Sequence, residues 1–343
     1  MQASQNTAQT VLCFVLVGAC GTVGSTNLGS FGTIPSMLTR RDFTGLVTAS
    51  LAMPGIGSRM IGQTAVSPSR AIKPKTSVMM WTLNKGGSFD QNLERVAEAG
   101  YDQVELVSEF KSWTPSDTAR ILARMEAVGV SVDAMAGMTI GFADPSGGDA
   151  FISELKTLIP VASRLGCQQI ILLSGKRIVF HAADSEIDSP AQHSASIETL
   201  KRAAELLSAA NIQGVIEPID RLENPTIYLD GVTEAFAIVK AVDSPVVRVL
   251  YDLYHEQRSH GNLLEKLQQN VALVGLIHVA DVPGRHQPGT GELDYGNIYR
   301  TLAELNYTGT IAMEFYPTGD VVTTLRDARE QVLRCFDPRS TMQ

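Results

Sequence analysis

Cysteine is scarce in this chain, and its four cysteines form no metal-binding pattern. Cys13 and Cys20 lie near the N-terminus, whereas Cys167 and Cys335 are far apart, so no pair has the spacing of a structural zinc site. The plain interpretation is that Cys167 and Cys335 are simple thiols, either buried or at the surface.

The sequence also lacks a stripe rich in lysine or arginine, and its formal net charge at pH 7 is −8. Proteins that bind nucleic acid through its phosphates need such a basic surface, so we expect no nucleic-acid partner. Long hydrophobic runs are missing too. The apolar run Val11–Ala19 is too short to span a membrane, and no basic residue precedes it as an export signal normally requires. We therefore expect no stable membrane span.

The first 75 residues have no acidic residue except Asp42 and are rich in glycine, serine, threonine and alanine. Within them the pair Arg40–Arg41 is followed by an aromatic residue and a weakly apolar run, which resembles a twin-arginine export signal. We expect residues 1–75 to be a largely disordered extension that carries this signal over residues 37–65 and then a linker. The protein would then be periplasmic or exported. The alternative is a chance arginine pair in a disordered tail of a cytoplasmic protein.

From Thr76 onward, short apolar runs alternate with longer amphipathic segments. The short runs show little polar alternation, as expected for strands buried on both faces. We predict strands over Ser77–Leu83, Gln103–Val107, Ser131–Ala136, Gln169–Leu173, Gly214–Glu217, Val246–Leu253, Val274–Ala280 and Gly309–Phe315. Helical patterns lie between them, over residues 90–100, 114–129, 151–165, 196–210, 232–242, 262–270 and 295–305.

Strands that alternate with helices in this way predict an α/β protein with a (β/α)₈ barrel, the TIM barrel, over residues 76–343. The 267 residues from Ser77 to the end are close to the roughly 250 typical of that fold. An open doubly wound sheet is the alternative. It normally has a G-x-G-x-x-G turn after its first strand, and the segment from Lys85 lacks that spacing.

The last four predicted strands each end at or near an acidic or imidazole side chain: Glu217, Asp252, His278 and Glu314. A charged residue in a buried run has a desolvation cost that a structural role rarely justifies. Functional residues of a TIM barrel lie at the C-terminal ends of its strands, and successive strands are neighbours, so these side chains should converge. Three carboxylates and an imidazole suit one divalent ion, Mn²⁺, Mg²⁺, Co²⁺ or Zn²⁺. Without a cation the carboxylates would repel one another.

Other polar residues surround this group. His255 follows Asp252 by three residues, and the loop after the seventh strand is rich in proline and glycine, which indicates an ordered loop. Within this loop, Arg285 could hold a substrate oxygen or carboxylate through two donors. The glycines at positions 289 and 291 are not a phosphate-binding loop, because no Lys-Ser/Thr follows them.

Four stretches carry a family resemblance: Glu217-Pro-Ile-Asp, Asp252-Leu-Tyr-His-Glu-Gln, Val279-Ala-Asp-Val-Pro-Gly-Arg-His-Gln-Pro-Gly-Thr-Gly-Glu-Leu-Asp-Tyr and Glu314-Phe-Tyr-Pro. Together they resemble the hydroxypyruvate isomerase family within the xylose-isomerase-like barrel superfamily, over roughly residues 77–320. The long loop motif is the specific part, because Glu-Pro alone is common.

The resemblance implies a metal-dependent isomerisation of a small α-hydroxycarbonyl compound, hydroxypyruvate to 2-hydroxy-3-oxopropanoate first of all, through a cis-enediolate. It implies that Glu217 and Glu314 bind the metal and also act as catalytic acid and base, and that His255 and Arg285 contact substrate oxygens. One departure concerns His278: hydroxypyruvate isomerases often have glutamine there, whereas the related ketose 3-epimerases have histidine. A ketose 3-epimerase or another sugar isomerase is therefore the alternative, and self-association into a homo-oligomer stays open.

Two other classes deserve comparison. Apurinic endonucleases of the same superfamily need additional histidine and aspartate ligands and a basic DNA-facing surface, whereas this chain has six histidines and a net charge of −8. A non-catalytic sugar-binding protein is the remote alternative. The presence of both Glu217 and Glu314 argues against it, because binding alone does not need two opposed bases.

Overall fold

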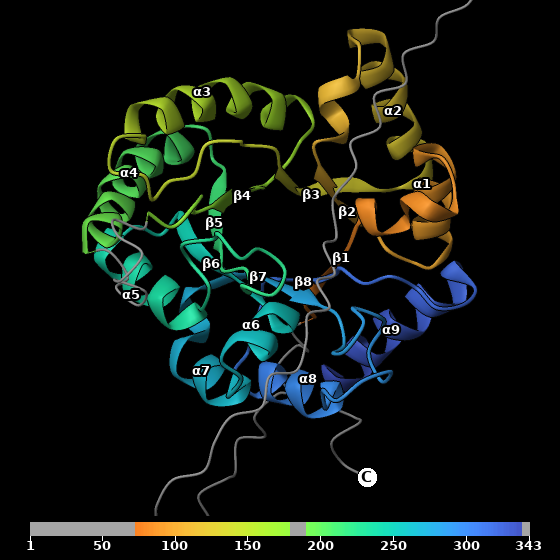
Figure 1. Ribbon diagram of the computed structural model, residues 1–343. Coiled ribbons are helices and arrows are strands. Elements are labelled where there is room, and N and C mark those ends of the chain that lie inside the picture. Colours follow the sequence, from red (N-terminus) through yellow and green to blue (C-terminus); the bar gives the residue numbers. More distant parts are fainter. Residues whose placement is uncertain (1–72, 179–189, 338–343) are drawn as a thin grey trace, which may run out of the picture. The chain divides into compact units, whose positions relative to one another are not determined.

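The computed structural model describes residues 73–178 and 190–337, and these form a closed barrel of eight parallel strands inside a ring of helices (Figure 1). The strands follow one another around the barrel in chain order, and β1 pairs with β8 to close it. They are β1 (Lys75–Met79), β2 (Gln103–Val107), β3 (Ser131–Ala136), β4 (Gln169–Leu173), β5 (Gln213–Glu217), β6 (Val247–Asp252), β7 (Val274–Val279) and β8 (Thr310–Met313). The predicted (β/α)₈ fold is confirmed. The predicted export signal lies outside the described residues.

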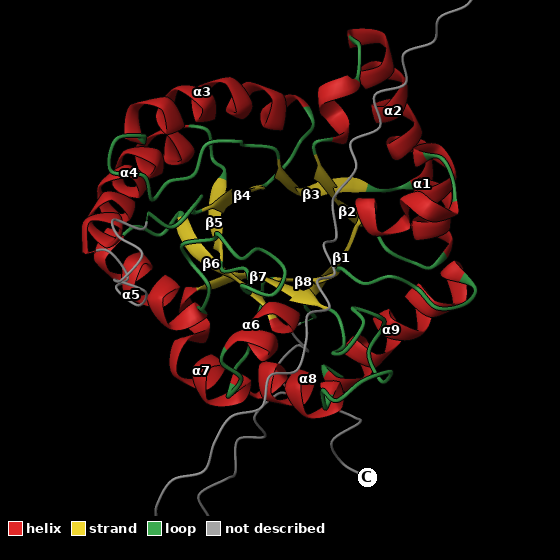
Figure 2. Ribbon diagram, in the orientation of Figure 1, coloured by secondary structure: helices red, strands yellow, loops and turns green. Residues whose placement is uncertain are grey.

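The helices cover the outer face of the barrel (Figure 2). They are α1 (Phe89–Glu98), α2 (Pro115–Val128), α3 (Gly148–Arg164), α4 (Pro190–Ala209), α5 (Val232–Val242), α6 (Leu253–Ser259), α7 (Leu263–Asn270), α8 (Tyr295–Glu304) and α9 (Val321–Cys335), with short 3₁₀ helices η1 (Met80–Gly86), η2 (Glu109–Ser112) and η3 (Val271–Leu273). Local sequence sets several of their ends. Ser88 and Thr114 each begin a helix with a capping box, and Gly129 ends α2 in the left-handed conformation at φ 72°. No helix in these two described ranges is long and apolar enough to cross a membrane.

The first strand differs from its prediction. The apolar run from Ser77 to Leu83 predicted one strand, but β1 ends at Met79 and η1 follows it. The hydroxyl of Thr82 donates to the carbonyl oxygen of Met79 at 2.8 Å and so helps to close the first turn of η1. The turn brings Trp81 to the mouth of the barrel. The helices α6 and α9 were not predicted either.

Apolar side chains fill two separate regions of the barrel. One lies between the strands and the surrounding helices. The other lies in the lumen and takes one buried residue from each of seven strands: Met79, Ala134, Ile171, Val215, Leu250, Leu276 and Ala312. On β2 the neighbours Val104 and Leu106 belong to the outer region, so Glu105 between them points into the lumen. A carboxylate thus takes the place that an apolar side chain has on the other strands.

Candidate active site

The ends of β5 to β8 bring Glu217, Asp252, His278 and Glu314 together, as the sequence predicted. One possible ligand atom from each lies within 4.8 Å of the others, and all four side chains are buried. Strand pairing produces this arrangement, since Asp252 is the register partner of His278. Glu314 follows β8 directly, and its N–H donates to the carbonyl oxygen of Val279 at 3.1 Å, which extends the ladder by one residue.

The atoms that face one another in this group lack hydrogen-bond partners. Nδ1 of His278 lies 2.7 Å from Oε2 of Glu314 and 3.8 Å from Oε1 of Glu217. The shorter contact does not have the alignment of a hydrogen bond, and both of its atoms are left without a partner, as is Oδ2 of Asp252. Buried polar atoms are normally paired. These three atoms lack hydrogen bonds to other described residues, although the two carboxylate oxygens lie within ion-pair distance of Arg285, and a group of carboxylates and imidazole fits a divalent cation.

The surroundings of the two glutamates shift their pKa values in opposite directions. Burial and the neighbouring charge of Glu314 raise the pKa of Glu217 to about 7. Burial acts on Glu314 in the same direction, but the charges of Arg285 and His278 outweigh it and hold the pKa of Glu314 below its ordinary value. One carboxyl therefore keeps a proton close to neutral pH while the other is ionised, which is the relation of an acid to a base.

Arg285 lies among the carboxylates. Its Nη2 is 2.9 Å from Oε2 of Glu314 and 3.6 Å from Oδ2 of Asp252, and its Nη1 is 3.1 Å from Oε1 of Glu223. The guanidinium also lies 5.4 Å from the centre of the Trp81 ring. None of the four strands that carry these residues brings a cation of its own to them. The loop after β7 supplies one, so Arg285 balances part of their repulsion.

His255 belongs to a second group at the same mouth. Its Nδ1 lies 2.7 Å from Oδ2 of Asp220, and its Nε2 lies 3.5 Å from Oδ2 of Asp252. Asp220, Glu223 and His255 form another set that could hold a metal. Here, however, Nη1 of Arg258 lies 3.2 Å from the Asp220 carboxylate and 2.9 Å from that of Glu223. Both sets thus contain an arginine, but Glu223 of the second set is exposed, whereas all four residues of the first set are buried, so the first set is the stronger candidate for a metal.

A cavity of about 380 Å³ opens above the predicted residues. One wall is apolar and comes from β1 to β4 and from η1: Met79, Trp81, Val107, Ala136, Ile171 and Leu173. The other wall is polar: Glu217, Glu223, Asn224, His255, Arg285 and Glu314. Trp81 links the two walls, because its indole N–H donates to Oε1 of Glu314 at 3.1 Å. Sequence reasoning missed Trp81, Glu223 and Asn224, which belong to no motif that we recognised.

The loop after β7 is folded around one carboxylate. Asp281 accepts five backbone N–H groups at 2.9–3.1 Å, from Val282, Gly289, Thr290, Gly291 and Leu293. The same loop holds Arg285 in the left-handed conformation at φ 57°, with its N–H donating to the carbonyl oxygen of Asp281. A Cβ at Gly291 would lie 2.1 Å from the carbonyl oxygen of Val282, so only glycine fits there. The residues of the specific loop motif therefore fold this loop and hold Arg285 in place.

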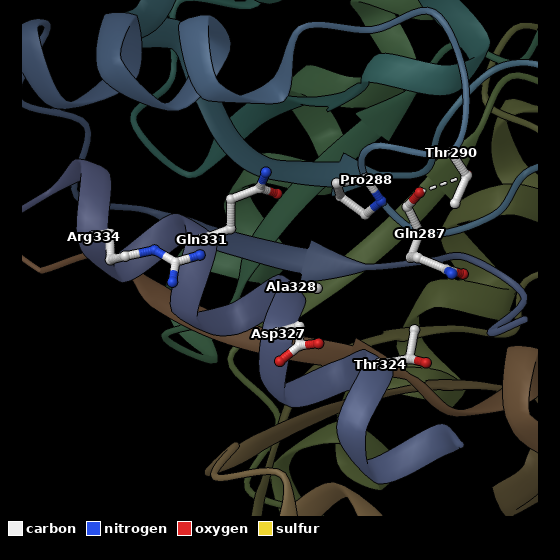
Figure 3. Close-up of a pocket in the computed structure, with 8 residues that line it drawn as sticks. All are labelled: Gln287, Pro288, Thr290, Thr324, Asp327, Ala328, Gln331 and Arg334. Atoms are coloured by element: carbon white, nitrogen blue, oxygen red, sulfur yellow. Dashed lines mark hydrogen bonds between the residues drawn. The ribbon is translucent and has the colours of Figure 1, made fainter. Parts of the chain in front are cut away.

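The other side of this loop faces α9 across a separate cavity of about 430 Å³ (Figure 3). Gln287, Pro288 and Thr290 line it from the loop, and the hydroxyl of Thr290 donates to the carbonyl oxygen of Gln287 at 2.7 Å. Its lining includes none of the four converging residues of the barrel mouth. The cavity therefore separates the loop from α9 without contributing to the site.

Comparisons with known proteins agree with this architecture. The profile of a family described as "Xylose isomerase-like TIM barrel" matches residues 93–335. The chain is similar to a hydroxypyruvate isomerase of Escherichia coli (strain K12), with 29% identity over 194 residues, 57% of this chain and 70% of that protein. It is also similar to a 2-oxo-tetronate isomerase of Cupriavidus necator, with 29% identity over 234 residues, 66% of this chain and 87% of that protein.

Two solved structures are similar in fold. A family 2 AP endonuclease from Brucella melitensis has a TM-score of 0.65 and 24% identity and covers 74% of this chain and 96% of its own. A D-psicose 3-epimerase from Clostridium cellulolyticum H10 has a TM-score of 0.61 and 18% identity and covers 78% of this chain and 98% of its own. At these identities the likeness establishes the fold alone.

Proposed function

The chain belongs to the xylose isomerase-like TIM barrel family, and we propose that it converts hydroxypyruvate to 2-hydroxy-3-oxopropanoate with one divalent metal ion. That it is an isomerase of small hydroxy-oxo compounds rests on its relatives, a hydroxypyruvate isomerase and a 2-oxo-tetronate isomerase. The observation that carries the finer proposal is the convergence of Glu217, Asp252, His278 and Glu314, with unpaired ligand atoms, at the mouth of the barrel.

The two glutamates move the proton in this proposal. A divalent ion held by the four residues would draw charge from the carbonyl and hydroxyl oxygens of the substrate and so acidify the C–H bond between them. One glutamate, Glu314 in this proposal, accepts the proton from the carbon that bears the hydroxyl group, and an enediolate forms. Glu217 returns a proton to the neighbouring carbon, while the hydroxyl proton passes to the other oxygen. Transfer of the proton from Glu314 back to Glu217 restores the pair for the next turnover. The product has the same atoms and charge as the substrate.

Arg285 and His255 orient the substrate. The guanidinium of Arg285 lines the cavity. It already pairs with Glu314 and Glu223, but its remaining N–H groups can donate to a substrate carboxylate, which suits a 2-oxo acid better than an uncharged sugar. His255 is held by Asp220 through Nδ1, and its Nε2, 3.5 Å from Oδ2 of Asp252, makes no hydrogen bond to the described residues and can contact a substrate oxygen there. The apolar wall opposite them excludes water from the reacting atoms.

A ketose 3-epimerase or another sugar isomerase is the second candidate. The cavity of about 380 Å³ favours it, because a three-carbon acid fills only part of that space. Glu217 ends β5 and Glu314 follows β8, so the two carboxyl groups reach the site from strands that are not neighbours, which suits proton exchange from two faces of one carbon.

A reconstitution assay tests the proposal. The purified protein is stripped of metal with a chelator, reloaded with Mn²⁺, Mg²⁺, Co²⁺ or Zn²⁺, and given hydroxypyruvate, 2-oxo-tetronate or D-psicose. We expect hydroxypyruvate turnover with metal and none without it. Turnover of D-psicose alone would select the second candidate. If the protein binds metal, as measured by elemental analysis, but converts no member of the panel, the isomerase proposal is wrong. Undiminished turnover after stripping would show that the reaction does not depend on the metal.

A further inference from the structure

We propose that Glu105 is a positioning residue for the metal site: it fixes the ring of His278 so that Nδ1 faces the cation. Glu105 lies in the middle of β2, points into the lumen and is fully buried. Its Oε2 lies 2.9 Å from Nε2 of His278, across the barrel on β7. This inference rests on the proposed metal site and adds to it a residue that is not a ligand.

The contact determines which nitrogen of His278 carries the ring proton. A neutral imidazole has one N–H donor and one acceptor nitrogen, and an ionised carboxylate only accepts. When His278 binds a metal, its ring is neutral and keeps one N–H. Glu105 beside Nε2 accepts that N–H, so the lone pair of Nδ1 is the one left for the metal. The opposite tautomer would set the lone pair of Nε2 against the Glu105 oxygen. Nδ1 is also the atom that lies 2.7 Å from Glu314 and has no hydrogen-bond partner.

The position of Glu105 argues that this contact has a function. Each of the other seven strands packs a buried apolar side chain into the lumen. A carboxylate buried there loses its hydration, and a buried ion pair seldom stabilises a fold more than well-packed apolar residues would. Its other oxygen, Oε1, has no hydrogen-bond partner among the described residues, so the interaction with His278 is what the carboxylate provides. Histidine ligands of metals commonly donate their second N–H to such a carboxylate, which also makes the ligand nitrogen more basic.

Asp133 provides a matched control within the same barrel. It is a fully buried carboxylate on β3, and it accepts a hydrogen bond from Nε2 of Gln169 at 3.1 Å rather than from a residue of the metal site. Asp133→Asn therefore removes a buried negative charge from the barrel interior without removing the contact to His278. Any effect that comes only from interior charge should appear in this variant as well.

The first test measures metal binding by the full-length protein. We expect Glu105→Ala to weaken Co²⁺ and Zn²⁺ binding about 100-fold, and Glu105→Gln about tenfold, because its amide oxygen still accepts from the Nε2–H. Asp133→Asn should stay within about twofold of the wild type. The visible absorption of bound Co²⁺ should change in Glu105→Ala and not in Asp133→Asn. Unchanged affinity and spectrum in Glu105→Ala, or an equal loss in Asp133→Asn, would overturn the inference.

A second test uses the wild-type protein and so does not depend on a variant that folds. Histidine labelled with ¹⁵N is followed by NMR as Zn²⁺ is added. We expect His278 to keep its proton on Nε2 and to bind Zn²⁺ through Nδ1, and metal on Nε2 would refute the assignment. A wild-type protein that binds no Zn²⁺ or Co²⁺ would overturn the proposed metal site itself. Metal binding by the wild type with the same affinity in Glu105→Ala would overturn the inference about Glu105 and leave the proposed metal site standing.

Discussion

The substitution Asp281→Asn tests whether the loop after β7 depends on a single carboxylate. Oδ2 of Asp281 accepts the N–H groups of Gly289, Thr290 and Gly291, and Oδ1 accepts those of Val282 and Leu293. Asparagine keeps one oxygen and replaces the other with an NH₂ group. At least two backbone N–H groups then face a donor instead of an acceptor, whichever way the amide turns.

The cost can be worked out from those contacts. A buried donor left without its acceptor costs about 1–3 kcal/mol, so two of them cost about 2–6 kcal/mol. This is a large share of the about 5–15 kcal/mol that holds a domain folded. The loop lies at the mouth, outside the ladder of the strands, so we expect the segment from Asp281 to Leu293 to open locally while the barrel persists. Arg285 would then lose its fixed position.

Hydrogen exchange and kinetics together measure this outcome. Amides 289–293 should exchange faster in Asp281→Asn, with β7 and β8 unchanged. Its kcat/KM should fall to the level of Arg285→Ala, and the double variant should fall no further, because both changes remove the same guanidinium. Asp294→Asn is the control, since Asp294 caps α8 through the Asn297 N–H and asparagine caps equally well. Wild-type exchange of the loop in Asp281→Asn would refute the reasoning.

Three other predictions concern separate parts of the chain. Glu314→Gln should slow proton exchange at the substrate carbon by about 10²–10⁴-fold and spare substrate binding, and retained exchange would remove Glu314 from the catalytic pair. Burial raises the pKa of Glu109 from its ordinary value of 4.5 to about 7. The folded state therefore holds more protons between those pH values, and stability falls as pH rises through them. Glu109→Gln should flatten this slope in urea titrations, and an unchanged slope contradicts the assignment. We also propose that residues 37–75, fused to a folded reporter, direct its export through the twin-arginine pathway. The double change Arg40→Lys and Arg41→Lys should block this export. A wild-type fusion that stays in the cytoplasm would refute the signal.

The sequence predicted the barrel and its four converging residues well, and the reason is physical. Strands buried on both faces must be continuous apolar runs, so their ends are visible where polar residues resume. The strands β2, β3 and β4 begin and end at the predicted residues. Chain-order pairing then places the ends of β5 to β8 side by side without further information.

Contacts across the barrel were harder to predict. Glu105 and His278 are 173 residues apart in the sequence, and only closure of the barrel brings them together. Glu105 does share the signature of the four predicted residues, a charge in an apolar run, but it stands in the middle of its run rather than at the end. Trp81 was missed for another reason: its run predicted a continuing strand, and a 3₁₀ turn places its indole at the mouth.

The aspartates of the mouth show how loop folding and site geometry share the same residues. Asp252 uses Oδ1 to cap α6 and leaves Oδ2 for the site. Asp220 uses Oδ1 to accept the N–H groups of Leu222 and Glu223 and Oδ2 to hold His255. Asparagine can replace the oxygen that serves the backbone in each case, but it cannot supply a second oxygen. At these two positions the change to asparagine should therefore remove the oxygen that serves the site and keep the one that serves the loop backbone. At Asp281 both oxygens accept backbone N–H groups, so the same change must disturb the loop first.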